Sequence, residues 1–131
     1  MKSRENLVRL KQFQVNEKRR QLLQLDMMIA EFERMANELD VQIAAEEKKA
    51  GITDVNHFAY PTFAKAAMQR RDNLLASAAE LKEQLAAAKA SHAEAAEELA
   101  KSEAIAERDH SREYSTAHEA PRMRDASAMA R

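Results

Sequence analysis

Residues 50–61 read AGITDVNHFAYP, and this stretch decides how the chain folds. It holds the only glycine of the 131-residue chain and the first of its two prolines. On each side lies a segment of roughly 45 residues that favour the α-helix, which would extend about 70 Å. We therefore expect the chain to reverse at residues 51–61, so that two long helices pack side by side.

The composition favours an all-α protein. Aromatic residues make up only 5% of the chain, and strands favour aromatic and β-branched residues. The absence of cysteine excludes disulfides and cysteine-ligated zinc. No apolar run is long enough to span a bilayer, and the N-terminus lacks the apolar core of a signal peptide. We therefore expect a cytoplasmic protein with no inserted membrane segment.

Heptad patterns on both sides of the turn predict an antiparallel coiled coil over residues 1–108. Residues 109–131 contain no Leu, Ile, Val or Phe, so we expect a frayed or disordered tail there. The predicted core positions of the first helix are Val8, Lys11, Val15, Lys18, Leu22, Leu25, Ile29, Phe32, Ala36, Leu39, Ile43 and Glu46. Those of the second are Leu74, Ala78, Leu81, Leu85, Ala88, His92, Ala95, Leu99, Ser102 and Ala106.

A reversal centred on residue 55 predicts that residues whose numbers add to 110 face each other. This register sets large side chains against small ones in several layers, as interdigitation requires. It also sets the basic first 20 residues beside the acidic stretch 94–107, which is modestly favourable. His92 would face Lys18, and we interpret that polar layer as a device that fixes the register.

No pattern in the sequence predicts an active site, a cofactor or a metal site. There is no glycine-rich phosphate loop and no Ser-His-Asp arrangement. Glu107 and His110 form a single Glu-x-x-His motif, whereas two-metal sites in helical bundles use two such motifs and two further carboxylates. The basic run 18–20 lacks an aromatic stacking platform, which argues against nucleic acid as a partner. We expect a protein that is not an enzyme and binds no nucleic acid.

Apolar residues outside the heptad positions indicate surfaces for protein partners. Phe13 and Met27 lie on the helix face opposite the predicted core, and a two-helix hairpin has no second core in which to bury them. Near the turn, Phe58, Tyr60 and Phe63 supply three of the six aromatic residues. The core positions of the two helices form one line of contact, which we call the seam. The three aromatic residues either pack on each other and close the end of the seam or contribute to a partner surface.

Two runs of sequence resemble the FliJ family, the small soluble component of the flagellar type III export apparatus, in its alphaproteobacterial branch. They are MKSRENLVRLKQFQVNEKRRQ at the N-terminus and AGITDVNHFAYPTFAKAAMQRR from residue 50, and the likeness covers roughly residues 1–108. The resemblance implies an antiparallel coiled-coil hairpin similar to the central stalk of F- and V-type ATPases. It also implies a monomer that couples the hexameric export ATPase to the export gate membrane protein and handles export chaperones. Such a protein of flagellum biogenesis and motility would lie at the inner-membrane flagellar base.

The resemblance also implies two sets of partner-binding residues. Export-gate contacts are expected at the start of the second helix, where Tyr60-Pro61-Thr62-Phe63 matches a Tyr-x-x-Phe pattern and the patch continues to Ala67 and Leu74. Contacts with the ATPase are expected at the start of the first helix. The expected ATPase-binding residues are Arg4, Leu7, Arg9, Lys11 and Lys18.

Two alternative functions stay open on the sequence. The first is a homodimeric coiled-coil scaffold, in which the helices pair between chains rather than within one. The second is a transcription factor with a coiled-coil arm. Such arms carry acidic residues at their tip, where this chain offers only Asp54.

Overall fold

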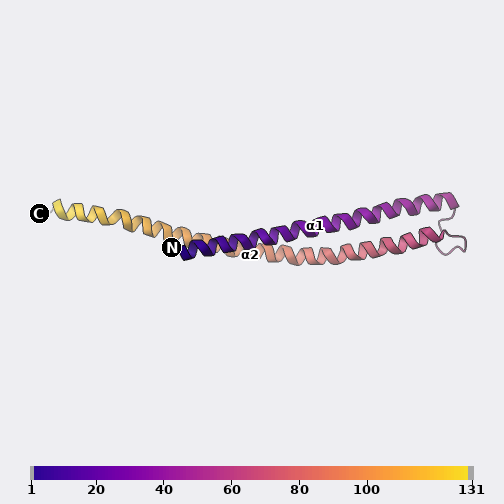
Figure 1. Ribbon diagram of the computed structural model, residues 1–131, viewed down its shortest axis with the longest axis horizontal. Coiled ribbons are helices and arrows are strands. Elements are labelled where there is room, and N and C mark those ends of the chain that lie inside the picture. The colour runs from indigo at the N-terminus through magenta and orange to yellow at the C-terminus, as the bar shows by residue number, and fades with distance from the viewer. Residues whose placement is uncertain (1, 130–131) are drawn as a thin grey trace. The chain divides into compact units, whose positions relative to one another are not determined.

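The computed structural model describes the backbone of residues 2–129 and the side chains of residues 2–116. It contains α1 (Lys2–Ala50) and α2 (Thr62–Met129), and no strand within that range (Figure 1). The two helices pack against each other, which confirms the predicted all-α fold. Neither of these helices, over its described length, has a stretch apolar enough to cross a membrane.

The second helix extends past the predicted end of the packed region. The sequence predicts a frayed or disordered tail over residues 109–131, whereas the described backbone is helical through Met129. This segment keeps Ala, Glu and Arg, which favour the helix even where large apolar residues are missing. The described backbone is therefore helical over most of residues 109–131, and residues 130 and 131 lie outside the described residues.

The chain forms two compact units. The tip unit comprises residues 20–90, with the end of α1, the connecting loop and the start of α2. The terminal unit comprises residues 1–19 and 91–131. Within the tip unit, the two helices run in opposite directions on either side of the loop (Figure 1).

The predicted glycine ends α1. Gly51 has a φ of 69°, and its N–H donates to the Glu47 carbonyl at 2.8 Å. This is a C-cap in the left-handed conformation, which glycine adopts without steric cost. After the loop, Pro61 directly precedes the helix that begins at Thr62. Its carbonyl accepts a 3.1 Å hydrogen bond from the Lys65 N–H at the start of that helix.

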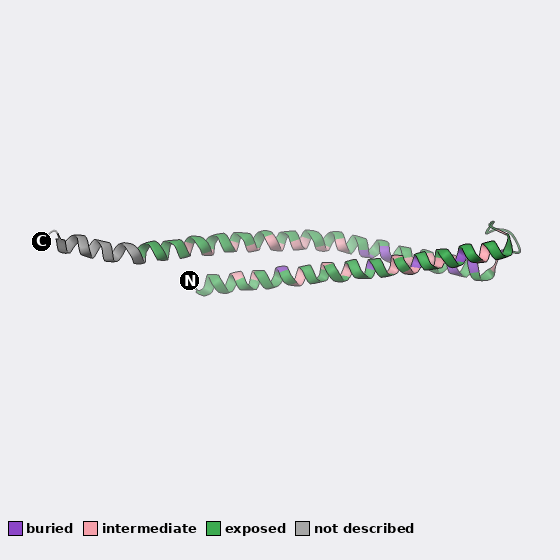
Figure 2. Ribbon diagram, turned by 90° about the horizontal axis from the view of Figure 1, so that it is seen from above, coloured by how far each residue is buried: buried purple, intermediate pink, exposed green. Residues whose placement is uncertain are grey.

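The predicted heptad positions form the core of the tip unit. Every predicted core position in this unit is buried or half-buried, which confirms the phase of both helices. Figure 2 shows the buried positions as an interrupted stripe along each helix. The most buried side chains next to the loop are those of Ile43, Tyr60, Ala64 and Ala67, with Leu39, Ile52 and Met68 packed against them.

Polar contacts beside the seam report the register of the tip unit. Arg71 Nη1 lies 2.9 Å from Asp40 Oδ1, and Lys82 Nζ lies 2.9 Å from Glu33 Oε1. The residue numbers of both pairs add to within five of the predicted 110. The Arg71–Asp40 pair, whose residue numbers add to 111, fits the register predicted from the sequence.

The terminal unit follows the same pattern. Val15 is buried, and the other predicted core positions from Val8 to Lys18 and from His92 to Ala106 are half-buried. Lys11 Nζ lies 2.9 Å from Glu98 Oε2, so a residue of the basic start meets a residue of the acidic stretch. This contact confirms the predicted pairing of opposite charges.

Candidate partner-binding surfaces

Three of the four expected gate-binding residues belong to the seam of the tip unit. Tyr60, which lies in the loop just before α2, is only 7% exposed, whereas Ala67 is buried and Leu74 is half-buried because both fall in the helical phase of the core. Phe63 alone has an exposed side chain, at 55%. Of the four expected gate-binding residues, Phe63 therefore presents an exposed side chain, while the other three lie in the seam of the same unit.

Tyr60 has a defined polar anchor inside the seam. Its hydroxyl donates a 3.3 Å hydrogen bond to Glu47 Oε2, and it lies 3.8 Å from Met68 Sδ. Burial, followed by the neighbouring Glu47 carboxylate, raises the pKa of the Tyr60 hydroxyl above its ordinary value. Tyr60 therefore stays protonated and links the start of α2 to the end of α1.

The connecting loop is closed by its own hydrogen bonds. Asp54 Oδ1 accepts from the Asn56 N–H at 3.0 Å, and the Asp54 carbonyl accepts from the His57 N–H at 3.1 Å. His57 Nδ1 accepts from the Ala59 N–H, and the His57 carbonyl accepts from the Tyr60 N–H, each at 3.0 Å. Because two side-chain acceptors and two backbone carbonyls satisfy these backbone donors, the loop has a defined shape.

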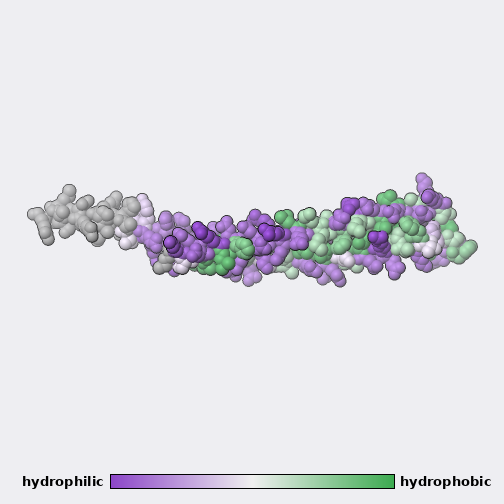
Figure 3. Space-filling model, in the orientation of Figure 1, coloured by the Kyte–Doolittle hydropathy of each residue, from purple (hydrophilic) through white to green (hydrophobic). Residues whose placement is uncertain are grey.

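Phe58 projects from this loop and is 96% exposed. Its ring stacks on His57, with the ring centroids 4.7 Å apart and the planes inclined by 22°. The three aromatic residues near the turn therefore do not pack on one another: Tyr60 closes the seam, whereas Phe58 and Phe63 face outward. Figure 3 shows apolar side chains gathered over this part of the tip unit.

The basic start of α1 contributes to an apolar groove in the terminal unit. Leu7 and Ile105, each 44% exposed, line it together with Arg4, Ser102 and Arg108. The groove thus combines two aliphatic side chains with two guanidinium groups. Sequence reasoning identified Arg4 and Leu7 but missed Ile105 and Arg108, which lie two residues beyond the positions that the register rule sets opposite Leu7 and Arg4.

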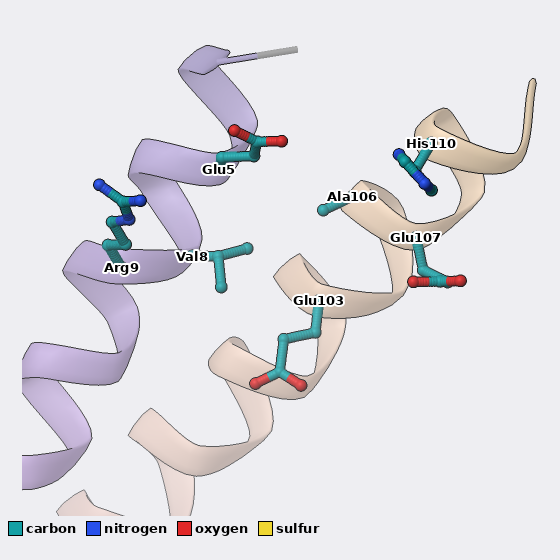
Figure 4. A pocket seen from close by; sticks show the side chains of 7 residues that line it. All are labelled: Glu5, Val8, Arg9, Glu103, Ala106, Glu107 and His110. Carbon is teal, nitrogen blue, oxygen red and sulfur yellow. The ribbon is translucent and has the colours of Figure 1, made fainter. Parts of the chain in front are cut away.

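Arg9 borders a second, more polar hollow in the same unit. Figure 4 shows Val8 and Ala106 pointing toward each other between the helices, with Arg9 and Glu107 directed away from that space. Among the residues that the structure describes, no group of three or more His, Cys, Asp or Glu side chains is arranged to hold a metal ion. The remaining residues that line the hollow are Glu5, Glu103 and His110.

The two remaining predicted ATPase-binding residues, Lys11 and Lys18, are half-buried in the seam. Lys11 donates to Glu98, and this hydrogen bond lowers the pKa of the Glu98 carboxyl. Lys18 lines a hollow that includes Glu98. His92 Nε2 is buried and has no hydrogen-bond partner among the described side chains, and a buried polar atom of this kind lowers the stability of the seam.

Large apolar side chains are exposed on α1 away from the seam, as the sequence predicts. Phe13 and Leu23 are exposed, and Met27 is 73% exposed. In the tip unit, Met27 and Met28 line a shallow hollow with half-buried Phe32. Methionine side chains adapt to partner surfaces of different shape, which suits a docking site.

These observations define the class of the protein. It is an all-α chain whose two long helices pack on a seam rich in alanine, while large apolar side chains remain exposed elsewhere. No family model, no curated protein and no solved structure matches the chain.

Proposed function

We propose that this chain is a non-enzymatic component of the flagellar type III protein export apparatus, where it couples the hexameric export ATPase to the export gate. One observation carries the proposal: large apolar side chains lie outside the seam in both units, while alanines occupy much of the seam. Exposed apolar surface of this kind is typical of proteins that dock on others.

The ATPase contact is assigned to the terminal unit. Leu7 and Arg9 are exposed and offer an aliphatic and a basic group on the first turns of α1. Arg4 is exposed as well, and its Nη1 lies 2.7 Å from Asp109 Oδ2 of the same unit. Lys11 and Lys18 act there chiefly by holding the seam, because their side chains are half-buried. Basic groups at a protein interface favour an acidic partner surface and accelerate association.

The gate contact is assigned to the tip unit. Phe63 supplies an exposed aromatic group near the start of α2, and aromatic residues are enriched among those that dominate binding energy. Tyr60, Ala67 and Leu74 position the helix that carries it.

The hollow beside Met27 and Met28 is the proposed site for export chaperones. The working location is the cytoplasmic side of the inner membrane at the flagellar base.

The proposal is tested by mixing the purified full chain with the purified export ATPase. We expect the two proteins to copurify and the rate of ATP hydrolysis to rise. The variant Arg4→Glu/Arg9→Glu should reduce both effects while its helical circular dichroism stays unchanged. If the wild-type chain neither binds the ATPase nor changes its hydrolysis, the proposal is wrong.

Sedimentation of the chain alone tests the scaffold alternative. Pairing of α1 with α2 inside one chain predicts the mass of a monomer, whereas a homodimeric scaffold predicts twice that mass. A labelled DNA duplex, titrated with the chain at low salt, tests the transcription-factor alternative, since phosphate contacts are strongest under that condition.

A further inference from the structure

We propose that Phe58 is an anchor that inserts into an apolar pocket on a protein partner. Its side chain is 96% exposed, so it contributes almost nothing to the stability of the tip unit. The buried cluster beneath the loop is complete without it, since Ile43, Tyr60, Ala64 and Ala67 fill that space. An aromatic ring that the fold does not use is therefore free to act in recognition.

The loop holds this ring in place before any partner arrives. The Phe58 ring stacks on His57, whose Nδ1 atom in turn accepts a hydrogen bond from the Ala59 N–H. The backbone on the other side is tied to Asp54. A preorganised side chain loses little conformational entropy on binding, so more of the burial energy of the ring appears as affinity.

The charge of the loop favours a protein pocket over a lipid surface. Asp54 is the only charged residue between Gly51 and Pro61, and the loop contains no lysine or arginine. Adsorption to an anionic bilayer depends on cationic residues beside the inserted group, and Asp54 would oppose it. A pocket with an apolar floor for Phe58 and a basic rim near Asp54 would satisfy both side chains.

This inference rests on the proposed function, which assigns the tip unit to the export gate. The probe is therefore the purified cytoplasmic part of the export gate protein, titrated with the labelled full chain. Phe58→Ala should raise the dissociation constant at least about tenfold, as expected for an anchoring aromatic residue. Its melting temperature should match that of the wild type, because the ring is outside the core.

Two further variants separate the contributions of shape and charge. Phe13→Ala truncates an exposed phenylalanine in the terminal unit and should leave the affinity for the gate unchanged. Asp54→Asn removes the charge but keeps a side-chain oxygen that can accept from the Asn56 N–H, so the loop should keep its shape. This variant should weaken binding by about two- to tenfold and flatten its dependence on salt.

The possible outcomes distinguish the two proposals. If the wild-type chain binds the gate and Phe58→Ala binds equally well, the anchor is wrong and the proposed function stands. If the wild-type chain does not bind the gate at all, the gate assignment fails and the anchor fails with it. The last experiment measures binding of the chain to vesicles of phosphatidylglycerol and phosphatidylethanolamine. If the chain binds these vesicles, if binding is lost in Phe58→Ala and if it strengthens in Asp54→Asn, then Phe58 inserts into lipid and the proposed protein pocket is wrong.

Discussion

Arg71 Nη1 lies 2.9 Å from Asp40 Oδ1, and this contact joins α2 to α1 at the edge of the tip-unit seam. Arg71 is half-buried in the helical phase of the core, yet its guanidinium reaches carboxylates at the surface. Hydrogen bonds to Asp40 and then to Asp72 raise the pKa of Arg71 further. A cation can therefore occupy a seam position without being left unpaired.

Reversing this pair should test the register of the tip unit. Asp40→Arg should lower the free energy of unfolding by about 1 kcal/mol, because it sets two guanidinium groups against each other in a partly exposed position. The double variant Asp40→Arg/Arg71→Asp should recover most of the loss. Urea unfolding followed by circular dichroism measures both, and the absence of recovery would contradict the pairing.

A charge placed in the seam should separate the helices. Leu25→Asp introduces a carboxylate at a half-buried core position and should lower the free energy of unfolding by about 2 kcal/mol or more. Leu23→Asp is the matched control, since Leu23 is exposed on the outer face of the same helical turn. We expect a change within about 0.5 kcal/mol for the control. Equal effects of the two substitutions in thermal melts would refute the assigned face.

The glycine that ends α1 should be sensitive to any side chain. Gly51→Ala should cost about 1 kcal/mol, because a φ of 69° is unfavourable for a residue with a Cβ atom. The cost comes from the backbone alone, since a Cβ atom added there meets no atom within 4 Å. Gly51→Asn should cost less, because asparagine tolerates the left-handed conformation better than alanine. A gain of stability in Gly51→Ala, measured by urea unfolding, would mean that the loop adopts another conformation.

The Lys11–Glu98 contact should make the terminal unit sensitive to acid. The pKa of Glu98 lies below its ordinary value of 4.5 in the folded chain, so the contact stabilises the fold above pH 4.5 and is lost as the pH falls through the lowered pKa. Glu98→Gln should therefore lower the melting temperature at neutral pH. The difference from the wild type should shrink steadily as the pH is lowered below 4.5. A difference that is the same at neutral and acidic pH would show that the charge of Glu98 plays no part.

Truncation of Phe63 tests the gate contact without disturbing the fold. Phe63→Ala should weaken binding to the cytoplasmic part of the export gate by about tenfold, because the exposed ring is available to a partner. Its helical circular dichroism and melting temperature should stay close to those of the wild type. Tyr60→Ala provides the contrast and should lower the melting temperature, since that ring fills the seam. A large loss of helix in Phe63→Ala would assign that residue a structural role.

The sequence predicted the fold because one rule, the heptad spacing, determines which residues are buried along both helices. Val15, Ile29 and Ala78 were assigned to the core by spacing alone, and each is buried. The same rule, together with a reversal centred on residue 55, predicted which parts of the two helices meet.

The candidate surfaces were harder to predict because they depend on where the second helix begins. Heptad spacing was applied from Leu74 onward, so it did not reveal that Tyr60 and Ala67 share the seam phase. The orientation of Phe58 follows from hydrogen bonds inside the loop, which no periodic pattern encodes. Extending the four-and-three spacing back toward the loop would have identified Tyr60 as a core residue.

The small side chains in the tip-unit seam have a thermodynamic consequence. Ala36, Ala64, Ala67 and Ala78 are almost completely buried, but together they remove little hydrocarbon from water. The heat-capacity change on unfolding scales with the apolar area that becomes hydrated. A calorimetric scan of the isolated chain should therefore show only a small step in heat capacity between the folded and unfolded baselines.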